Sequence, residues 1–193
     1  STIDLAFRNN TQQMHFINAN CSKYFRKIKT IIKTSGSANW TRSDYLFGQS
    51  VKDLKTKTYS GSIQINNTSL SFLSAQFETR ATVVNSVVSG SSTDRIFMNN
   101  NYLEMSVFPV DNHTLTLKSE YYITNIESQR NQFFLDAVYR TTIPKTKIDI
   151  ELTGINLLNN NQYARLYNLD FIVVKNFFQL RPRQIMASVR FKF

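Results

Sequence analysis

The sequence predicts an all-β fold, an antiparallel β-barrel whose strands cross a membrane, and three observations lead to this prediction. Apolar and polar side chains alternate with a period of two in about nine segments, and a strand places alternate side chains on opposite faces. Short turns and long loops alternate along the chain, which is typical of outer-membrane barrels. The charged residues of these segments fall in one of the two alternating series, so the other series is almost free of charge, as contact with lipid requires.

The composition agrees with strands that are apolar on one side only. Apolar residues make up 41% of the 193 residues and charged residues 19%, which excludes a disordered chain. No run of about 18 apolar residues exists, as a membrane helix would need. A barrel strand needs only about 10 residues, half of them apolar, and the mean hydropathy of -0.30 fits such strands.

The last segment, residues 184–193, shows the alternation most clearly. Apolar side chains alternate with polar or long ones, Met186 is the one exception, and the chain ends on an aromatic residue. The apolar positions are Ile185, Ala187, Val189, Phe191 and Phe193. A strand that contacts lipid on one side and water on the other accounts for this pattern, whereas a soluble sheet rarely ends on an exposed Phe.

Eight earlier segments alternate in the same way. We predict strands, in order, at 1–8, 12–28, 55–66, 73–83, 102–107, 115–124, 135–140 and 148–153. Short polar turns are expected near 9–11, 66–69, 109–113 and 143–146. Long loops are expected near 29–54, 86–95, 125–131 and 159–181, and part of the first of these alternates, so it could hold a hairpin of its own. If the short turns are periplasmic, the last strand runs inward and ends at the periplasmic rim.

Charges of both signs recur in the polar series of these strands. Charges cannot face a dry core without partners, so we predict that these side chains face a water-filled lumen. They are Glu78, Arg80, Glu104, Lys118, Glu120, Asp136, Arg140, Asp149, Glu151 and Arg190. The alternative is a soluble up-and-down barrel or sandwich with its polar face in bulk water. Strands of roughly 12 residues favour the membrane, since ordinary strands run about 5–6 residues.

The chain is strongly basic, with a formal net charge of +10 and a pI near 9.8. Basic chains often bind nucleic acid, and a soluble β-protein that does so would bind in a salt-sensitive manner. The positive residues lie mainly in connecting segments, such as 26–33 and 52–57. We therefore interpret them as solvated loop charges and expect no nucleic-acid partner.

No catalytic, metal or cofactor site is predicted. One cysteine and two histidines provide no zinc spacing, and glycine-rich phosphate loops and nucleophile motifs are absent. The two long loops carry aromatic side chains that could stack on a sugar or grip a partner, or could belong to an aromatic girdle at the membrane interface. The candidate ligand-binding residues are Trp40, Tyr45, Tyr163, Arg165 and Tyr167.

Three stretches resemble the C-terminal end of a TonB-dependent outer-membrane receptor of the Bacteroidota type. Residues 156–163 (NLLNNNQY) are similar to the "NLFN…Y" motif at the end of that family's penultimate strand, with Leu158 in place of the commoner Phe. Residues 180–184 (LRPRQ) are similar to the beginning of its last strand. Residues 189–193 (VRFKF) are similar to its closing strand. The likeness covers about the last 40 residues.

The resemblance implies that the chain is one part of a larger barrel. The family's barrel has about 22 strands around a plug, so residues 1–193 would form a C-terminal β-barrel segment, with the plug outside this chain. Val189, Phe191 and Phe193 would be the C-terminal signal for the outer-membrane assembly machinery. The remaining strands and the plug, in the same protein or another chain, are expected as partners. So are membrane lipid, TonB through an N-terminal part outside this chain, and a surface lipoprotein lid.

The function implied by this resemblance is import across the bacterial outer membrane. The chain would form the wall of a TonB-dependent active transporter for a nutrient of the glycan, peptide, siderophore or vitamin class, and it would not be an enzyme. The alternative is a structural or assembly subunit of an outer-membrane complex that transports nothing itself.

Overall fold

Most of the described residues lie in β-strands. The computed structural model describes residues 12–47, 50–92, 95–125, 131–169 and 172–191. The strands are β1 (Gln12–Phe25), β2 (Thr30–Phe47), β3 (Ser50–Leu70), β4 (Leu73–Val88), β5 (Ser91–Ser92), β6 (Ile96–Val107), β7 (His113–Thr124), β8 (Asn131–Ile143), β9 (Ile148–Ile155), β10 (Gln162–Leu169), β11 (Ile172–Gln179) and β12 (Gln184–Phe191), and a 3-10 helix, η1 (Arg26–Ile28), joins β1 to β2.

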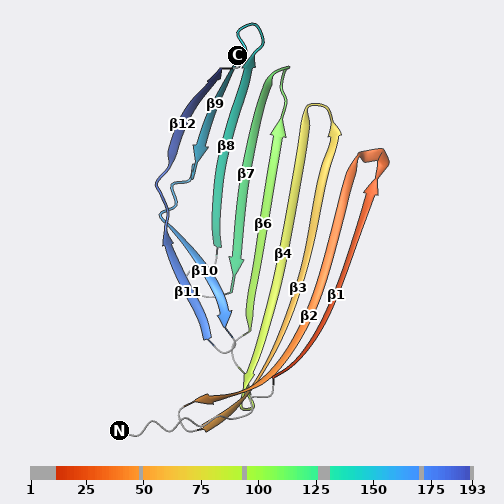
Figure 1. Ribbon diagram of the computed structural model, residues 1–193, viewed down its shortest axis with the longest axis vertical. Coiled ribbons are helices and arrows are strands. Elements are labelled where there is room, and N and C mark those ends of the chain that lie inside the picture. Colours follow the sequence, from red (N-terminus) through yellow and green to blue (C-terminus); the bar gives the residue numbers. More distant parts are fainter. Residues whose placement is uncertain (1–11, 48–49, 93–94, 126–130, 170–171, 192–193) are drawn as a thin grey trace.

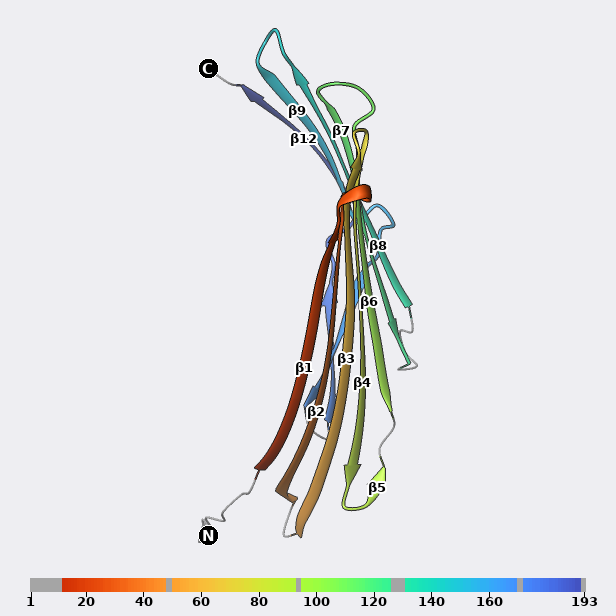
Figure 2. The ribbon, with the colours of Figure 1, turned by 90° about the vertical axis from the view of Figure 1, so that its right-hand side faces the viewer.

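Nine of these strands form one sheet in the order β1-β2-β3-β4-β6-β7-β8-β9-β12, and all neighbours along this path are antiparallel. The short β5 pairs with β4 outside this path, and β10 and β11 form a separate hairpin. Figure 1 shows the sheet as a fan with β1 at one edge and β12 at the other. Figure 2 shows it from the side as a single twisted layer. The prediction of an all-β, antiparallel architecture is confirmed, and the sheet is open rather than closed on itself.

The pairing register gives the sheet two faces of opposite character. Gln76, Glu104, Lys118 and Asp136 are successive cross-strand partners on β4, β6, β7 and β8, so they share one face, here named the polar face. The neighbouring row consists of the partners Ala75, Met105, Leu117 and Ala137. It belongs to the opposite face, here named the apolar face. A slip of one residue in any strand would exchange the two sets.

No second layer covers the apolar face. In the described part of the chain, the only buried hydrophobic residues are Leu54, Val84 and Ile96, and the register assigns all three to the polar face. On the apolar face, Val189 is 54% exposed and Phe191 is 60% exposed. A soluble sandwich would bury such residues against another sheet. The fold therefore leaves its apolar face free for an apolar surrounding.

The segment 29–54, predicted to be a long loop, is mostly strand. It contains all of β2 and the beginning of β3, which pair along their whole length from Thr30–Asn67 to Phe47–Ser50. The prediction missed β2 because small and hydroxyl side chains such as Thr34, Gly36 and Ala38 weaken the apolar signal of its alternation. The hairpin expected within this segment therefore exists, and it is formed by the full length of β2 and by β3.

The structure contradicts one further loop prediction, leaves the N-terminal predictions untested, and contains the remaining predicted strands. The loop predicted at 159–181 is wrong, because this segment contains the β10–β11 hairpin, paired from Gln162–Gln179 to Leu169–Ile172. The strand predicted at 1–8 and the turn at 9–11 lie outside the described residues. The other predicted strands, at 12–28, 55–66, 73–83, 102–107, 115–124, 135–140, 148–153 and 184–193, correspond to β1, β3, β4, β6, β7, β8, β9 and β12. The first ends earlier than predicted, because residues 26–28 form η1, and residues 192–193 of the last lie outside the described residues.

The two ends of the sheet carry different connections. At one end, three of the turns contain a residue with positive φ: Lys29 at 41°, Asn112 at 65° and Lys147 at 53°. The fourth follows a β-bulge between Asn67 and Leu70. At the other end, β9 continues into the hairpin, and β4 reaches β6 through β5. At this end β2 and β3 are joined without such an added element. Instead, these two strands, of 18 and 21 residues, extend further along the sheet than their neighbours.

Asn156 fixes the point where the chain leaves β9. Its φ of 53° is a left-handed conformation that Asn tolerates better than most residues. Its side-chain amide donates hydrogen bonds to the carbonyls of Asn160 and Arg181, both at 2.9 Å. Its side-chain oxygen accepts one from the amide of Asn160, also at 2.9 Å. Asn156 thus closes the turn and ties it to the segment that precedes β12.

A second asparagine reinforces this junction. The side-chain oxygen of Asn159 accepts a hydrogen bond from the backbone amide of Arg183 at 3.0 Å. The backbone amide of Asn156 donates to the Asp136 carboxylate on β8 at 2.7 Å. The segments 156–160 and 181–183, which carry two of the sequence motifs, therefore contact each other and hold β8, β9 and β12 together.

We expect the substitution Asn156→Ala to lower the free energy of unfolding by about 2 kcal/mol, because it removes three hydrogen bonds from a buried side chain. The measurement is the urea midpoint of the folded protein. Asn100→Ala is the matched control, since Asn100 is exposed on β6 and should change stability by less than about 0.5 kcal/mol. Equal effects of the two substitutions on the free energy of unfolding would show that the hydrogen bonds of Asn156 do not stabilise the fold.

Candidate functional site

The charged residues predicted to face a lumen all lie on the polar face. Lys118 pairs with Glu104 and Asp136, Arg140 pairs with Glu151, and Asp149 pairs with Arg190. The remaining members, Glu78, Arg80 and Glu120, belong to the same face by alternation along β4 and β7. The register thus gathers these side chains, from six different strands, on one side of the sheet. That this side faces a lumen stays a prediction.

Opposite charges on the polar face neutralise one another locally. Arg140 contacts the Glu151 carboxylate through Nε at 2.9 Å and through a terminal nitrogen at 2.5 Å. Lys118 lies 3.5 Å from Glu104, and Arg80 lies 3.6 Å from Glu78. The Arg140, Lys118 and Arg80 side chains remain 45–63% exposed. The face is therefore wet and dipolar, with both signs of charge available to a polar solute.

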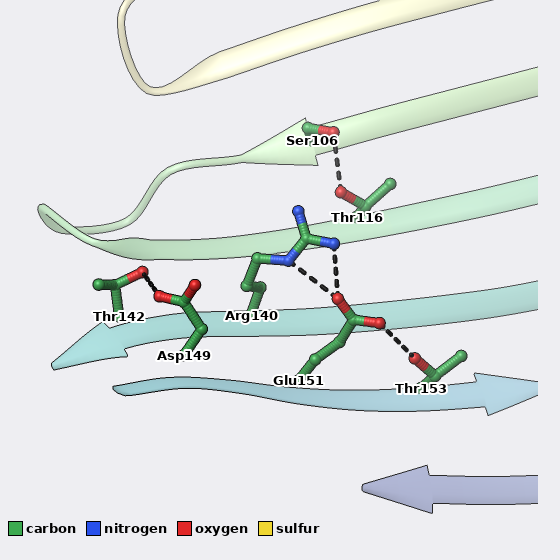
Figure 3. Close-up of polar contacts among 7 residues, drawn as sticks. All are labelled: Ser106, Thr116, Arg140, Thr142, Asp149, Glu151 and Thr153. Atoms are coloured by element: carbon green, nitrogen blue, oxygen red, sulfur yellow. Dashed lines mark hydrogen bonds and ion pairs between the residues drawn. The ribbon is translucent and has the colours of Figure 1, made fainter. Parts of the chain in front are cut away.

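Hydroxyl groups extend this network on the same face. Figure 3 shows Thr142 donating to Asp149 at 2.8 Å and Thr153 donating to Glu151 at 3.4 Å. Ser106 and Thr116 share a hydrogen bond of 2.9 Å. A shallow depression is lined here by Glu104, Thr114, Thr116, Lys118, Val138 and Arg140. Such a surface suits hydrated, hydrogen-bonding solutes rather than apolar ones.

An aromatic cluster adjoins the charges at the opposite end. Tyr163 of β10 lies 5.5 Å from Tyr122 and 5.8 Å from Phe134, measured between ring centroids. It also stacks on Phe178 of β11 at 6.2 Å. Tyr122 and Phe134 belong to the polar face, and the hydroxyl of Tyr122 donates to Glu120 at 2.5 Å. The cluster thus holds the base of the β10–β11 hairpin against the polar face.

Sequence reasoning missed most of this cluster. Tyr122 and Phe134 are large aromatic residues in a series that is mostly polar, and that exception was the available signal. Their contact with Tyr163 depends on how the hairpin folds back, which local alternation does not encode. The sequence marks Asn156 only as part of a motif, and its hydrogen bonds in the turn appear only in the structure.

The five candidate ligand-binding residues do not form one site. Trp40 lies in β2 rather than in a loop, on the apolar face, and Tyr45 lies in the same strand. Tyr163, Arg165 and Tyr167 lie in β10. Of these three only Tyr163 has a described side chain, and it belongs to the aromatic cluster. The structure therefore separates Trp40 from Tyr163, and the side chains of the other three are outside its description.

The residues predicted as the C-terminal assembly signal are partly described. Val189 pairs with Ile150 and Phe191 pairs with Ile148, next to the turn that joins β8 to β9. Both side chains are exposed on the apolar face. Phe193 lies outside the described residues. The outer edge of β12 has no partner strand in the described part of the chain.

Two further features concern the described residues as a whole. They contain no group of three His, Cys, Asp or Glu side chains that could hold a metal ion. They also contain no helix whose length and apolar character would let it cross a membrane. Compared with protein-family models, curated proteins and solved structures, the chain matches none.

We expect Tyr163→Ala to release the β10–β11 hairpin from the polar face. Each aromatic contact contributes about 0.5–1.5 kcal/mol, so amide hydrogen exchange in residues 162–169 and 172–179 should accelerate roughly tenfold or more. Tyr163→Phe keeps the ring and loses only the hydroxyl that interacts with Tyr122, so it should raise the exchange rates much less than the alanine variant does. Unaltered exchange in the alanine variant would mean that the cluster does not hold the hairpin.

Proposed function

We propose that this chain forms part of the wall of a transmembrane β-barrel in the bacterial outer membrane. The observation that carries the proposal is a single-layer sheet with an exposed apolar face and an opposite face that bears charges of both signs. Lipid accepts the first face, and a water-filled interior accepts the second. A soluble protein with this surface would expose far more apolar area than solubility allows.

The dimensions of the apolar face support this placement. On β7 the apolar series runs from Leu115 to Ile123, eight steps of about 3.4 Å, or roughly 27 Å along the strand. A strand tilt of about 40° shortens this to roughly 21 Å, near the apolar band of about 25 Å in known barrels. On β2 the series runs from Ile32 to Trp40, which is the same number of steps.

The two free edges imply further strands. Unpaired backbone groups are costly in lipid, so membrane sheets close into barrels. β1 and β12 each have one side unpaired within the described residues. In our proposal, the rest of the same protein or another chain supplies the missing strands and a plug, and the complete barrel has about 22 strands.

We further propose that the complete barrel is a TonB-dependent active transporter. The support is the resemblance of residues 156–163, 180–184 and 189–193 to that receptor family, together with the contact between the first two stretches. The transporter would import a nutrient of the glycan, peptide, siderophore or vitamin class, with energy passed through TonB. The assembly machinery would recognise Val189, Phe191 and Phe193, and a surface lipoprotein lid is a further partner in this proposal.

The test of transport is uptake by intact cells. Cells that lack the gene and cells that lack TonB should lose uptake of the same nutrient from a panel of labelled oligosaccharides, peptides, siderophores and vitamins. A gene copy restored on a plasmid should rescue the first strain and not the second. Normal uptake of every panel member by the deletion strain, with loss of an outer-membrane complex instead, would favour the structural or assembly role.

A further inference from the structure

A basic patch lies on the apolar face at the end of β2 and β3 opposite the short turns. It is formed by Arg42, Lys55 and Lys57 and is here named the rim patch. Arg42 pairs with Lys55 across the two strands, and Lys57 pairs with Trp40. On the edge strand β1, His15 is the cross-strand partner of Trp40. A shallow depression lies between these side chains.

The charge of the rim patch is only partly compensated. Asp53 lies 3.0 Å from Arg42 and 3.3 Å from Lys55, yet these two cations remain 58% and 52% exposed. Lys57 is exposed and has no ion-pair partner among the described residues. Asp44, the cross-strand partner of Asp53, belongs to the same face, so three cations stand against two carboxylates and an excess of one positive charge remains.

An aromatic pair separates this patch from the apolar band. The Trp40 and Tyr59 rings meet edge to face at 6.1 Å, and the indole nitrogen of Trp40 donates to the Tyr59 hydroxyl at 3.3 Å. Beyond them toward the short turns, the same face presents Ile63, Ile65 and Ile32. Trp and Tyr are enriched at the headgroup level of membranes. From the rim patch toward the short turns, this face thus presents basic, then aromatic, then aliphatic residues. A membrane lipid has its phosphate, its backbone region and its acyl chains in the same order.

We propose that the rim patch binds the phosphate-bearing headgroup of a membrane lipid in the leaflet on this side, with the acyl chains along the aliphatic rows of β2 and β3. This inference rests on the proposed placement of the sheet in a membrane. Arg42 supplies a planar fork that matches phosphate oxygens, and Lys55 and Lys57 supply point charges. Trp40 and Tyr59 support the lipid backbone region. The patch is a lipid site because the adjoining face is apolar, whereas a site for a free anion would need no such rows.

Trp40 is the only tryptophan of the 193 residues, and it adjoins the patch, so its fluorescence provides the test. The purified protein is placed in phosphatidylcholine vesicles that contain a trace of nitroxide-labelled phosphatidic acid or, at the same mole fraction, nitroxide-labelled phosphatidylcholine. We expect phosphatidic acid to quench Trp40 several-fold more efficiently. The preference should fall to near unity in the triple variant R42Q/K55Q/K57Q, since each cation near a surface contributes to anion binding.

Two matched variants keep the test decisive. Lys33→Gln removes a cation from the polar face of the same strand and should leave the preference intact. Lys57→Gln removes the charge of a side chain that has no ion-pair partner among the described residues, so it should reduce the preference without disturbing the fold. Quenching of Trp40 by labelled phosphatidylcholine reports whether the triple variant inserts into the vesicles. If the triple variant does not insert, the result for Lys57→Gln decides whether the rim patch binds the lipid.

The outcomes separate the inference from the proposed function. Absence of Trp40 quenching by either lipid would overturn the membrane placement itself. Equal quenching by both lipids would preserve the placement and overturn the lipid site. A preference that survives in both the triple variant and Lys57→Gln would also overturn it. A preference abolished by millimolar inorganic phosphate would identify a site for free phosphate and contradict a lipid-specific one.

Discussion

The alternation of side chains across a single sheet is the constraint on which the rest of this structure depends. With no second layer, each strand has one apolar and one polar face, and each neighbour must pair in the register that keeps these faces aligned. The rows from Ala75 to Ala137 and from Gln76 to Asp136 show that β4, β6, β7 and β8 share one register. Backbone hydrogen bonds between the strands hold the sheet together. An apolar surrounding must therefore cover the apolar face, as a second layer of protein would in a sandwich, and water must solvate the polar face.

The polar face and the junction around Asn156 solve the two problems that such a sheet creates. Charges on the polar face find partners on neighbouring strands, as Arg140 does with Glu151, and they keep enough exposure to remain hydrated. The junction lets the chain leave the sheet after β9, form the hairpin, and return as β12 without losing the pairing of its backbone groups. The aromatic contacts of Tyr163 then hold the β10–β11 hairpin against the polar face.

Alternation was enough to predict the all-β architecture, most strands and the common face of residues such as Glu78 and Asp136, because a period of two is a local property. It failed at β2, where Thr34, Gly36 and Ala38 carry little apolar signal. It also failed at β10 and β11, and the contact of Tyr163 with Phe134 joins elements that no local pattern relates. Trp40 appeared as a loop residue only because its strand was missed.

Cysteine labelling along β7 tests the two-faced sheet most directly. Single cysteines replace Leu115, Leu117, Thr114 and Thr116 in turn, in a background in which Cys21, the only cysteine, is changed to Ser. The protein is probed in intact membranes with a water-soluble maleimide. The account predicts that positions 114 and 116 react, whereas 115 and 117 stay unreactive until the membrane is dissolved. Equal labelling at all four positions before solubilisation would contradict it.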